Sequence, residues 1–254
     1  VRVVGHRAHH HRAIAEQTVR PDEFQKGVGG EKQGEQQLHL PDHHRRVACR
    51  QIARHAAQLF DAYDGIDWLW DYMPYGPFRS LAQYHRWMRD ILADPAHLFY
   101  AIIDRERGRP AAVAAYLRMK PGSGSIEVGH INFAPVLQGS VAATEAMRLM
   151  MGWAFDAGYR RYEWKCDALN LKSRRAAQRL RFSYEGVFRQ ATVVKGRNRD
   201  TAWFSVIDQE WPALSAAYDQ WLAPRNFDAA GKQQESLSSL TALVGRTVDP
   251  ALSP

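Results

Sequence analysis

The hydrophobic period of the sequence changes twice along the middle of the chain, and this constrains the fold more than any other feature. Apolar runs at residues 98–103, 111–117 and 125–133 are separated by turn-forming residues, which predicts three successive strands. Across residues 142–156 polar side chains recur every three or four positions, as in a largely buried helix. Residues 162–166 alternate with period two, as in a strand with one buried face. The chain therefore combines a strand meander with a strand–helix–strand unit in one mixed α/β domain.

Further helical and extended segments flank this central region. Helical patterns at residues 52–63 and 80–92 precede it, with a loop rich in aromatic side chains between them at residues 67–78. A short helix, two strands joined by a turn and a longer helix follow it, at residues 173–180, 187–194, 201–207 and 210–222. The end of the chain from Asp228 is polar, and we expect it to be loose.

Composition narrows the class of protein. Of the 254 residues, 45% are apolar and 24% are charged, which is ordinary for a soluble globular chain. The longest apolar run, at residues 111–117, is too short to cross a bilayer, and the first forty residues lack a hydrophobic signal segment. Two cysteines are too few for a disulfide framework. We therefore expect a cytoplasmic protein with no membrane partner.

The first 48 residues differ in composition from the remainder. Seven of the eleven histidines lie there, among few large apolar residues, so we predict a flexible extension. The histidines lack the paired spacing of metal ligands on a helix or strand, and no metal is expected. We expect three parts: this extension at 1–48, the main domain at 49–212, and a C-terminal helix with a polar tail at 213–254.

The net charge of +7 favours anionic partners, although solubility alone is an alternative explanation of it. Such partners include nucleic acid, an acidic protein surface or a phosphorylated cofactor. The basic residues between Arg174 and Arg199 belong to no recognised nucleic-acid motif, so nucleic acid is not the expected partner.

The junction between the third strand and the long helix, at residues 132–144, is a candidate anion site. Pro135 interrupts strand pairing there, and unpaired N–H groups at a helix start attract phosphate oxygens. An ordinary strand-to-helix turn is the alternative. Small side chains that would let a ligand approach the backbone are those of Gly139, Ser140, Ala142 and Ala143.

A second candidate segment covers residues 170–186. Asn170 is placed to cap the short helix that follows it. Taken alone, the basic side chains behind it are more simply a solvated face than a phosphate site. They are Lys172, Arg174, Arg175 and Arg179.

Taken together, the content, order and spacing of these segments resemble the GNAT superfamily of N-acetyltransferases over residues 52–212, especially the bacterial ribosomal-protein-serine N-acetyltransferases. Residues 138–143 (Gln-Gly-Ser-Val-Ala-Ala) fit the family's coenzyme A pyrophosphate loop, with Val141 in place of a Gly. Arg181 likewise replaces a Gly in the later family motif. The residues that match that motif are Asn170, Ser173, Phe182, Glu185 and Gly186.

This resemblance implies both a fold and a reaction. The implied fold is α/β (α+β), with a mixed, mostly antiparallel central sheet of about six or seven strands flanked by helices. The implied reaction is direct transfer of acetyl from acetyl-CoA to a primary amine, without an acyl-enzyme. A protein N-terminus (possible on a ribosomal protein), a lysine or a small-molecule amine would be the acceptor, and the protein would be a monomer or homodimer.

The resemblance also implies roles for cofactor-binding residues. Backbone N–H groups near Asn132 and Phe133 would hold the acetyl carbonyl and the pantetheine, and Asn170 would fix the pantetheine arm. Arg174 would bind the cofactor from the same helix. The pyrophosphate would lie on the loop formed by Gln138, Gly139, Ser140, Val141, Ala142 and Ala143.

Three side chains are candidates for the chemistry, and a fourth is considered as a nucleophile. Ser173 corresponds to a residue that would donate a proton to the leaving thiolate. Glu127 is the first candidate for the general base and His130 the second, and the alternatives are an ion pair for Glu127 and a core position for His130. Cys166 lies on the buried face of its strand, so we expect it to be structural rather than nucleophilic.

Three departures from the family pattern have consequences. Residues 43–50 are a poor match to the strand that the family places ahead of the first helix. Val141 would reduce amide access for the pyrophosphate, and Arg181 would strain its turn if that position needs positive φ. A catalytically silent acyl-CoA-binding or ribosome-associated module is the alternative that these departures leave open.

Overall fold

The computed structural model of the protein describes residues 47–252, which contain a seven-stranded sheet with the order β1-β2-β3-β4-β5-β7-β6. Neighbouring strands are antiparallel except for β4 and β5. The predicted His-rich extension lies almost wholly outside the described residues. The strands are β1 (Val47–Gln51), β2 (His97–Asp104), β3 (Arg109–Lys120), β4 (Ser125–Phe133), β5 (Arg161–Asp167), β6 (Ser183–Val194) and β7 (Arg197–Ile207).

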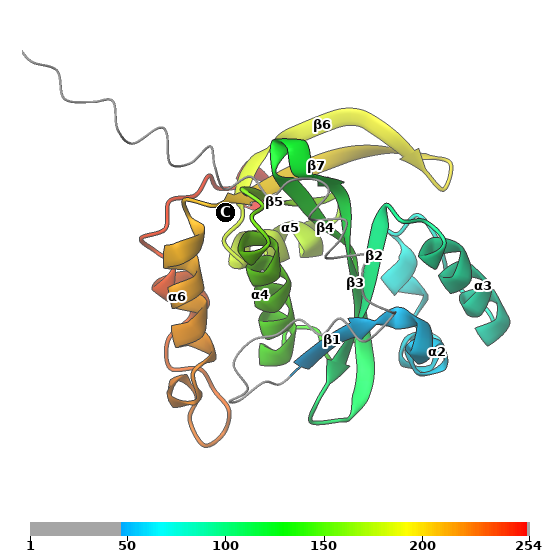
Figure 1. The fold of residues 1–254 in the computed structure, drawn as a ribbon, viewed down its shortest axis with the longest axis horizontal. Helices are drawn as coiled ribbons and strands as arrows, with labels where there is room; N and C mark the ends of the chain where they lie inside the picture. The colour runs from blue at the N-terminus through cyan, green and yellow to red at the C-terminus, as the bar shows by residue number, and fades with distance from the viewer. Residues whose placement is uncertain (1–46, 253–254) are drawn as a thin grey trace, which may run out of the picture.

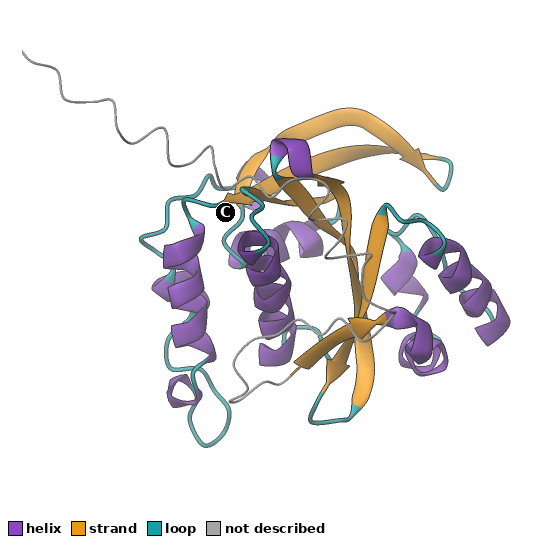
Figure 2. Cartoon of the chain, in the orientation of Figure 1, coloured by secondary structure: helices purple, strands orange, loops and turns teal. Residues whose placement is uncertain are grey.

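The sheet class matches the expectation of a mixed, mostly antiparallel sheet, and helices cover its two faces (Figures 1 and 2). One face carries α4 (Val141–Asp156), α5 (Leu171–Arg179), α6 (Trp211–Leu222) and the short α7 (Leu237–Leu240). The other face, at the β2–β3 half, carries α2 (Ala56–Tyr63) and α3 (Leu81–Leu92). None of the helices in residues 47–252 combines the length and apolar character of a membrane span.

The hairpin of β6 and β7 arches away from the rest of the sheet (Figure 1). Five short 3-10 helices lie in the connections of the described chain: η1 (Ile52–His55), η2 (Asp67–Trp70), η3 (Pro121–Ser123), η4 (Pro224–Asn226) and η5 (Pro250–Leu252).

The first strand forms despite its poor sequence match. Val47–Gln51 pairs antiparallel with β2, in a register that places Val47 opposite Asp104 and Gln51 opposite Tyr100. Residues 47–51 form a strand because their backbone pairs with the apolar strand β2, although the basic residues around them do not predict a strand. The doubt raised by residues 43–50 is therefore resolved in favour of the strand.

The hydrophobic patterns follow from how many faces of a strand are covered. β3 is buried continuously over residues 110–117 because α2 lies on one face and α4 on the other. In β5 only alternate residues are buried, because that strand has helices on one face alone. The opposite face of β5 therefore presents polar side chains.

The chain beyond Asp228 is packed, which corrects the expectation that it is loose. Leu237 joins the core beside α6, and Thr241 and Asp249 are fully buried. Backbone pairing reaches the start of β6, where the Tyr184 N–H donates to the carbonyl of Thr247. Polar composition misled the prediction because buried polar groups are tolerated where each finds a partner.

The parallel pairing of β4 with β5 stops early, and this opens the sheet. The last paired residues are Val128 and Trp164, although both strands continue beyond them. The register of β4 against β3 shifts in the same stretch, where His130 adopts a φ of 51°. The two strands diverge past this bulge, in front of the first turn of α4.

Candidate active site

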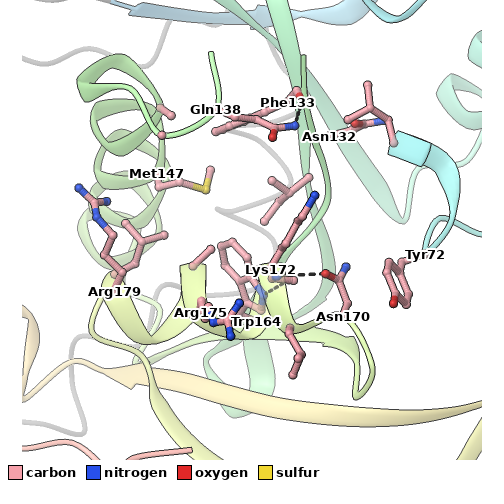
Figure 3. Close-up of a pocket in the computed structure, with 18 of the residues that line it drawn as sticks. Tyr72, Asn132, Phe133, Gln138, Met147, Trp164, Asn170, Lys172, Arg175 and Arg179 are labelled. Atoms are coloured by element: carbon pink, nitrogen blue, oxygen red, sulfur yellow. Dashed lines mark hydrogen bonds between the residues drawn. The ribbon is translucent and has the colours of Figure 1, made fainter. Parts of the chain in front are cut away.

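A cavity of about 860 Å³ occupies the gap between the diverging strands, within the size range of small-molecule sites. Its walls are the end of β4 at residues 131–133, the first turn of α4, Trp164 of β5 and the first turn of α5. Residues 68–73, from the aromatic loop, close one side. Figure 3 shows Gln138 and Met147 from the α4 side, and Lys172 and Arg175 from α5.

The start of α4 supplies backbone donors to this cavity. Ser140 caps the helix by accepting the N–H of Ala143 at 3.0 Å. Within the described chain, the N–H groups of Val141 and Ala142 have no hydrogen-bond acceptor. Free amides and the positive end of a sixteen-residue helix suit phosphate oxygens.

The loop ahead of α4 is shaped for this exposure. Gly139 has a φ of 68°, in the left-handed region that favours glycine, and a Cβ there would meet open space. The Gln138 side chain folds back, and its Nε2 donates to the Phe133 carbonyl at 2.7 Å (Figure 3). This bond ties the loop to the last residue of β4.

Asn132 carries a buried amide that the protein leaves unpaired. The residue is only 5% exposed and lines the cavity, yet its Nδ2 has no hydrogen-bond partner among the described residues. Its backbone carbonyl accepts the Tyr63 hydroxyl at 2.8 Å, which fixes its position. An orphaned buried donor is costly, so a bound ligand with an acceptor oxygen would stabilise it.

The start of α5 faces the same cavity from β5. Asn170 caps the helix, with its Oδ1 accepting the Ser173 N–H at 3.0 Å. The Ser173 hydroxyl accepts Trp164 Nε1 at 3.0 Å, which leaves its own proton as a donor, toward Cys166 or a ligand. Ser173 is therefore a positioned hydroxyl donor on the wall of the cavity.

The basic side chains of α5 divide into two groups. Lys172, Arg175 and Arg179 line the cavity, and Arg179 also donates to Thr144 Oγ1 of α4 at 2.9 Å. Arg174 is turned away, into a buried pair with both Asp249 oxygens at 2.6 Å. Three of these cations thus lie at the site. Arg174 does not line the cavity, contrary to the expectation that it binds the cofactor, and pairs instead with Asp249 of the C-terminal segment.

The two glycine replacements leave the cavity open. Val141 packs its side chain against the hydrophobic core and, like Ala142, does not line the cavity, so the replacement does not narrow it. Arg181 has a φ of 69°, which confirms that its position needs the left-handed region. Its guanidinium donates to the carbonyls of Ala242 and Val244, and these bonds offset the strain.

Comparison with known proteins decides the class. Residues 46–183, more than half of the chain, match the acetyltransferase (GNAT) domain family. The chain belongs to this family. Like the proteins of that family, it is an acetyl-CoA-dependent N-acetyltransferase whose acceptor is an amine.

Solved structures agree with this membership. A GCN5-related N-acetyltransferase from Brucella melitensis is 43% identical, with a TM-score of 0.76 over 79% of this chain and 93% of its own. A probable GNAT-family acetyltransferase from Chromobacterium violaceum ATCC 12472 is 38% identical, with a TM-score of 0.66 over 72% of this chain and 91% of its own.

A ribosomal acetyltransferase shares the fold at greater distance. RimL, a ribosomal L7/L12 alpha-N-protein acetyltransferase, is 19% identical, with a TM-score of 0.58 over 70% of this chain and 98% of its own. That identity shows the fold alone. The comparison with curated proteins finds no match.

The residues around the cavity fit the acetyl donor of a GNAT transferase. Coenzyme A has phosphate groups and an arm that contains amides. The cavity borders the start of α4, where two amides are unpaired in the described chain, and it is lined by the unpaired Asn132 amide and three cations. Among residues 47–252, no three His, Cys, Asp or Glu side chains are grouped as metal ligands would be.

Cys166 of the transferase is buried and free, on the core face of β5. Burial raises the pKa of its thiol to about 11. The thiol therefore stays protonated at neutral pH, where a nucleophilic cysteine needs to be a thiolate. This agrees with a structural role.

Glu127 lies outside the cavity, in a chain of ion pairs on the helix-free face of the sheet. Its oxygens meet Arg118 Nη1 at 2.7 Å and Lys165 Nζ at 2.8 Å. Lys165 also meets Glu163 at 2.7 Å, and its ammonium lies 3.7 Å from the centre of the Trp203 ring. The ion-pair alternative is thus present in the structure.

His130 also lies outside the cavity lining, within the aromatic cluster under α3. Its ring is stacked on Tyr75, and Nδ1 shares a 3.0 Å hydrogen bond with the Tyr75 hydroxyl. Burial, with a smaller effect of His97 and of Arg118 and Arg199, lowers the pKa of His130 to about 4. The imidazole is neutral at pH 7 and a weak base.

The structure adds contacts that the sequence alone does not reveal. Trp68, Leu69, Tyr72 and Met73 line the cavity, whereas Phe78 of the same loop is packed among aromatic rings of the second core cluster. Tyr72 donates its hydroxyl to the Leu169 carbonyl at 3.2 Å and thereby joins the aromatic loop to the β5–α5 turn. Aromatic composition marks such a loop but not which rings face a ligand.

Proposed function

We propose that acetyl-CoA lies in the gap between β4 and β5, with its pyrophosphate on the α4 start and its thioester near Asn132. The observation that carries this is the cavity itself: it is lined by Gly139, Ser140 and Ala143 at the start of α4 and by Asn132, whose buried amide is unpaired in the described chain. Phosphate oxygens would accept the N–H groups of Val141 and Ala142, which have no acceptor in the described chain, and Gln138 would hold the loop.

The acyl end would use backbone and amide donors. The N–H groups near Asn132 and Phe133, with Asn132 Nδ2, are placed for the acetyl carbonyl and the pantetheine, and Asn170 supports the arm from α5. Preorganised donors of this kind contribute about 3 kcal/mol each to the transition state. The thioester supplies an activated acetyl carbonyl that an amine attacks directly.

Ser173 would return a proton to the leaving sulfur. Its hydroxyl can act as a donor because its oxygen accepts from Trp164 Nε1. Arg174 is held in a buried ion pair with Asp249. It would act on the cofactor only by holding α5 in place. We therefore propose Arg174 as a positioning residue.

The base is proposed to act through water. Glu127 faces the helix-free side of the sheet and remains the first candidate, but taking up a proton would disturb its two ion pairs. His130, held neutral by burial, is the second. An amine that arrives uncharged needs neither group at the moment of attack.

The acceptor is an amine, and the resemblance of the sequence makes a free protein N-terminus the first class to test. A ribosomal protein is one source of such an N-terminus, and lysine and small amines are the others. All of them would enter past the aromatic loop, whose exposed Trp68 and Tyr72 flank the cavity.

The experiment measures release of free coenzyme A from acetyl-CoA with a panel of peptides and small amines. We expect Ser173→Ala to lower kcat about a hundredfold, as for loss of a general acid, with the KM for acetyl-CoA little changed. Ser236→Ala, at the cap of the remote α7, is the matched control and should retain full activity. A loss below threefold in Ser173→Ala would contradict the assigned role.

A further inference from the structure

Arg199 of β7 differs from the other arginines that are at least partly buried. Among residues 47–252, every other such arginine has a hydrogen-bond or ion-pair partner, whereas Arg199 has neither. Its Nε is also fully buried. Burying a guanidinium N–H without an acceptor is costly, so such a group points to a missing acceptor. The partnered arginines are Arg148, Arg161, Arg174, Arg181 and Arg246.

A second orphaned donor lies on the same face of β7. Trp203 Nε1 is buried and has no acceptor within the described chain. Residues 199, 201 and 203 alternate with Ala202 and Phe204, which face the core under α4. Arg199 and Trp203 therefore both face the helix-free side of the sheet.

Nearby carboxylates are already engaged. Glu127 and Glu163 are held by Lys165, and Glu163 and Glu185 are also held by Arg161. The Asp200 carboxylate accepts the Gln190 N–H and the Asn198 amide. The described chain thus brings cations to this face and leaves none of these carboxylates to Arg199.

Arg199 lies near the point where acetyl transfer would occur. The pairing of β5 with β7 ends with Asp167 opposite Thr201, so Arg199 lies two residues past the paired end of β5, and its charge lowers the pKa of His130 at the bulge of β4. The hairpin that carries it is joined to the aromatic loop, because Lys195 Nζ donates to the Trp70 carbonyl at 2.8 Å. Arg199 therefore flanks the gap on the side opposite α4, from which an amine would enter.

We propose that the acceptor amine carries an anionic group, a carboxylate or a phosphate, that binds Arg199. The guanidinium fork matches both groups in a bidentate arrangement. Trp203 Nε1 offers a further donor on the same face. The proposal rests on the function proposed above, since it names the class of amine that this acetyltransferase takes.

The experiment uses pairs of amines that differ in one anionic group. Suitable pairs are glutamate with glutamine, phosphoethanolamine with ethanolamine, and peptides that begin Ala-Asp with peptides that begin Ala-Asn. We expect at least one anionic amine to be preferred over its neutral counterpart tenfold or more in kcat/KM. Comparing the carboxylate pairs with the phosphate pair shows which anionic group the protein binds.

Arg199→Gln should remove this preference and leave the neutral member within about twofold. The KM for acetyl-CoA should not change. Arg197→Gln is the matched control, because Arg197 lies two residues away on the same strand, is exposed and has no partner in the described chain. The control should keep the preference.

Three results would overturn the proposal while leaving the function intact: equal kcat/KM within every pair, an equal loss of both members in Arg199→Gln, or the same loss in Arg197→Gln. If no amine is acetylated, binding of the anionic amines in the presence of coenzyme A decides the matter. Absence of that binding in wild type overturns the anion site, whereas absence of acetyl-CoA binding separately overturns the proposed function.

Discussion

The two sides of the gap between β4 and β5 are built differently. The side with α4 and α5 takes most of its functional groups from two short, continuous segments. Each segment is a helix start, capped by Ser140 in α4 and by Asn170 in α5. The opposite side is assembled from an aromatic loop, a bulge in β4, and side chains of β5 and β7 that are distant in sequence. The first side suits a constant cofactor, and the second can vary with the acceptor.

The difference shows that a site made of backbone amides depends on local structure, whereas a site made of side chains depends on contacts with other side chains. A helix start offers donors wherever its cap and loop permit. A side-chain site needs each partner held by others, as Tyr75 holds His130 and Glu127 holds Lys165. Substitutions should therefore act locally on the cofactor side, except where α5 itself depends on distant contacts.

The largest expected effect tests that exception. Asp249→Ala leaves the buried Arg174 guanidinium without its partner, so the free energy of unfolding should fall by about 3–5 kcal/mol. Urea denaturation measures the change. In the control, Asp67→Ala removes the partner of the exposed Arg79 and should cost about 1 kcal/mol or less. Equal losses in the two variants would show that α5 is not held by this pair.

On the acceptor side, the pH dependence of stability tests the burial of His130. Its pKa falls from 6.5 to about 4 in the folded protein, so the folded state binds fewer protons than the unfolded state between these values. Stability should therefore be full above pH 6.5 and should decline by about 3 kcal/mol as the pH falls to 4.

The comparison for this prediction is His130→Asn, because asparagine tolerates the positive φ at this position. Chemical denaturation at pH 7 and pH 4.5 should give a smaller difference for the variant than for wild type. Identical differences would mean that His130 is not held neutral by its surroundings.

A smaller effect is expected on the cofactor side from Gln138→Glu. The carboxylate cannot donate to the Phe133 carbonyl, and it places a negative charge beside the phosphates. The Kd for acetyl-CoA should rise about tenfold or more, while acceptor binding changes little. Calorimetric titration with each ligand separates the two, and equal losses would contradict a cofactor role for this loop.

The smallest effect should come from Cys166→Ser. The thiol has a pKa raised to about 11 and faces the core, so direct transfer does not need it. We expect kcat to stay within a few-fold of wild type in a variant whose folding is confirmed by circular dichroism. Complete loss of activity in a folded variant would favour an acyl-enzyme instead.

Sequence reasoning reached the cofactor side because its information is local. The small residues Gly139, Ser140 and Ala143 and the cap at Asn170 lie in continuous motifs, and the structure places them around one cavity. The partner of Arg174 is 75 residues away, so nothing in the helix itself distinguishes it from Arg175. The same distance hid the packing of the last segment, whose polar Asp249 is buried only because Arg174 meets it.

The acceptor side was less predictable for the same reason. The alternation of β5 indicated which side chains are polar, but the register with β4 and β7 decides that Lys165 meets both Glu127 and Trp203. Likewise, Arg199 reads as one basic residue in a charged turn. Only its surroundings show that it lacks a partner.

The central claim is that acetyl-CoA occupies the gap in front of α4, and one calorimetric titration tests it most directly. Ala143 lines that gap, and Ala143→Trp would fill it. We predict saturable heat with acetyl-CoA for wild type and little or none for the variant, with both proteins folded by circular dichroism. Unchanged binding in the folded variant, or no heat with wild type, would contradict the account.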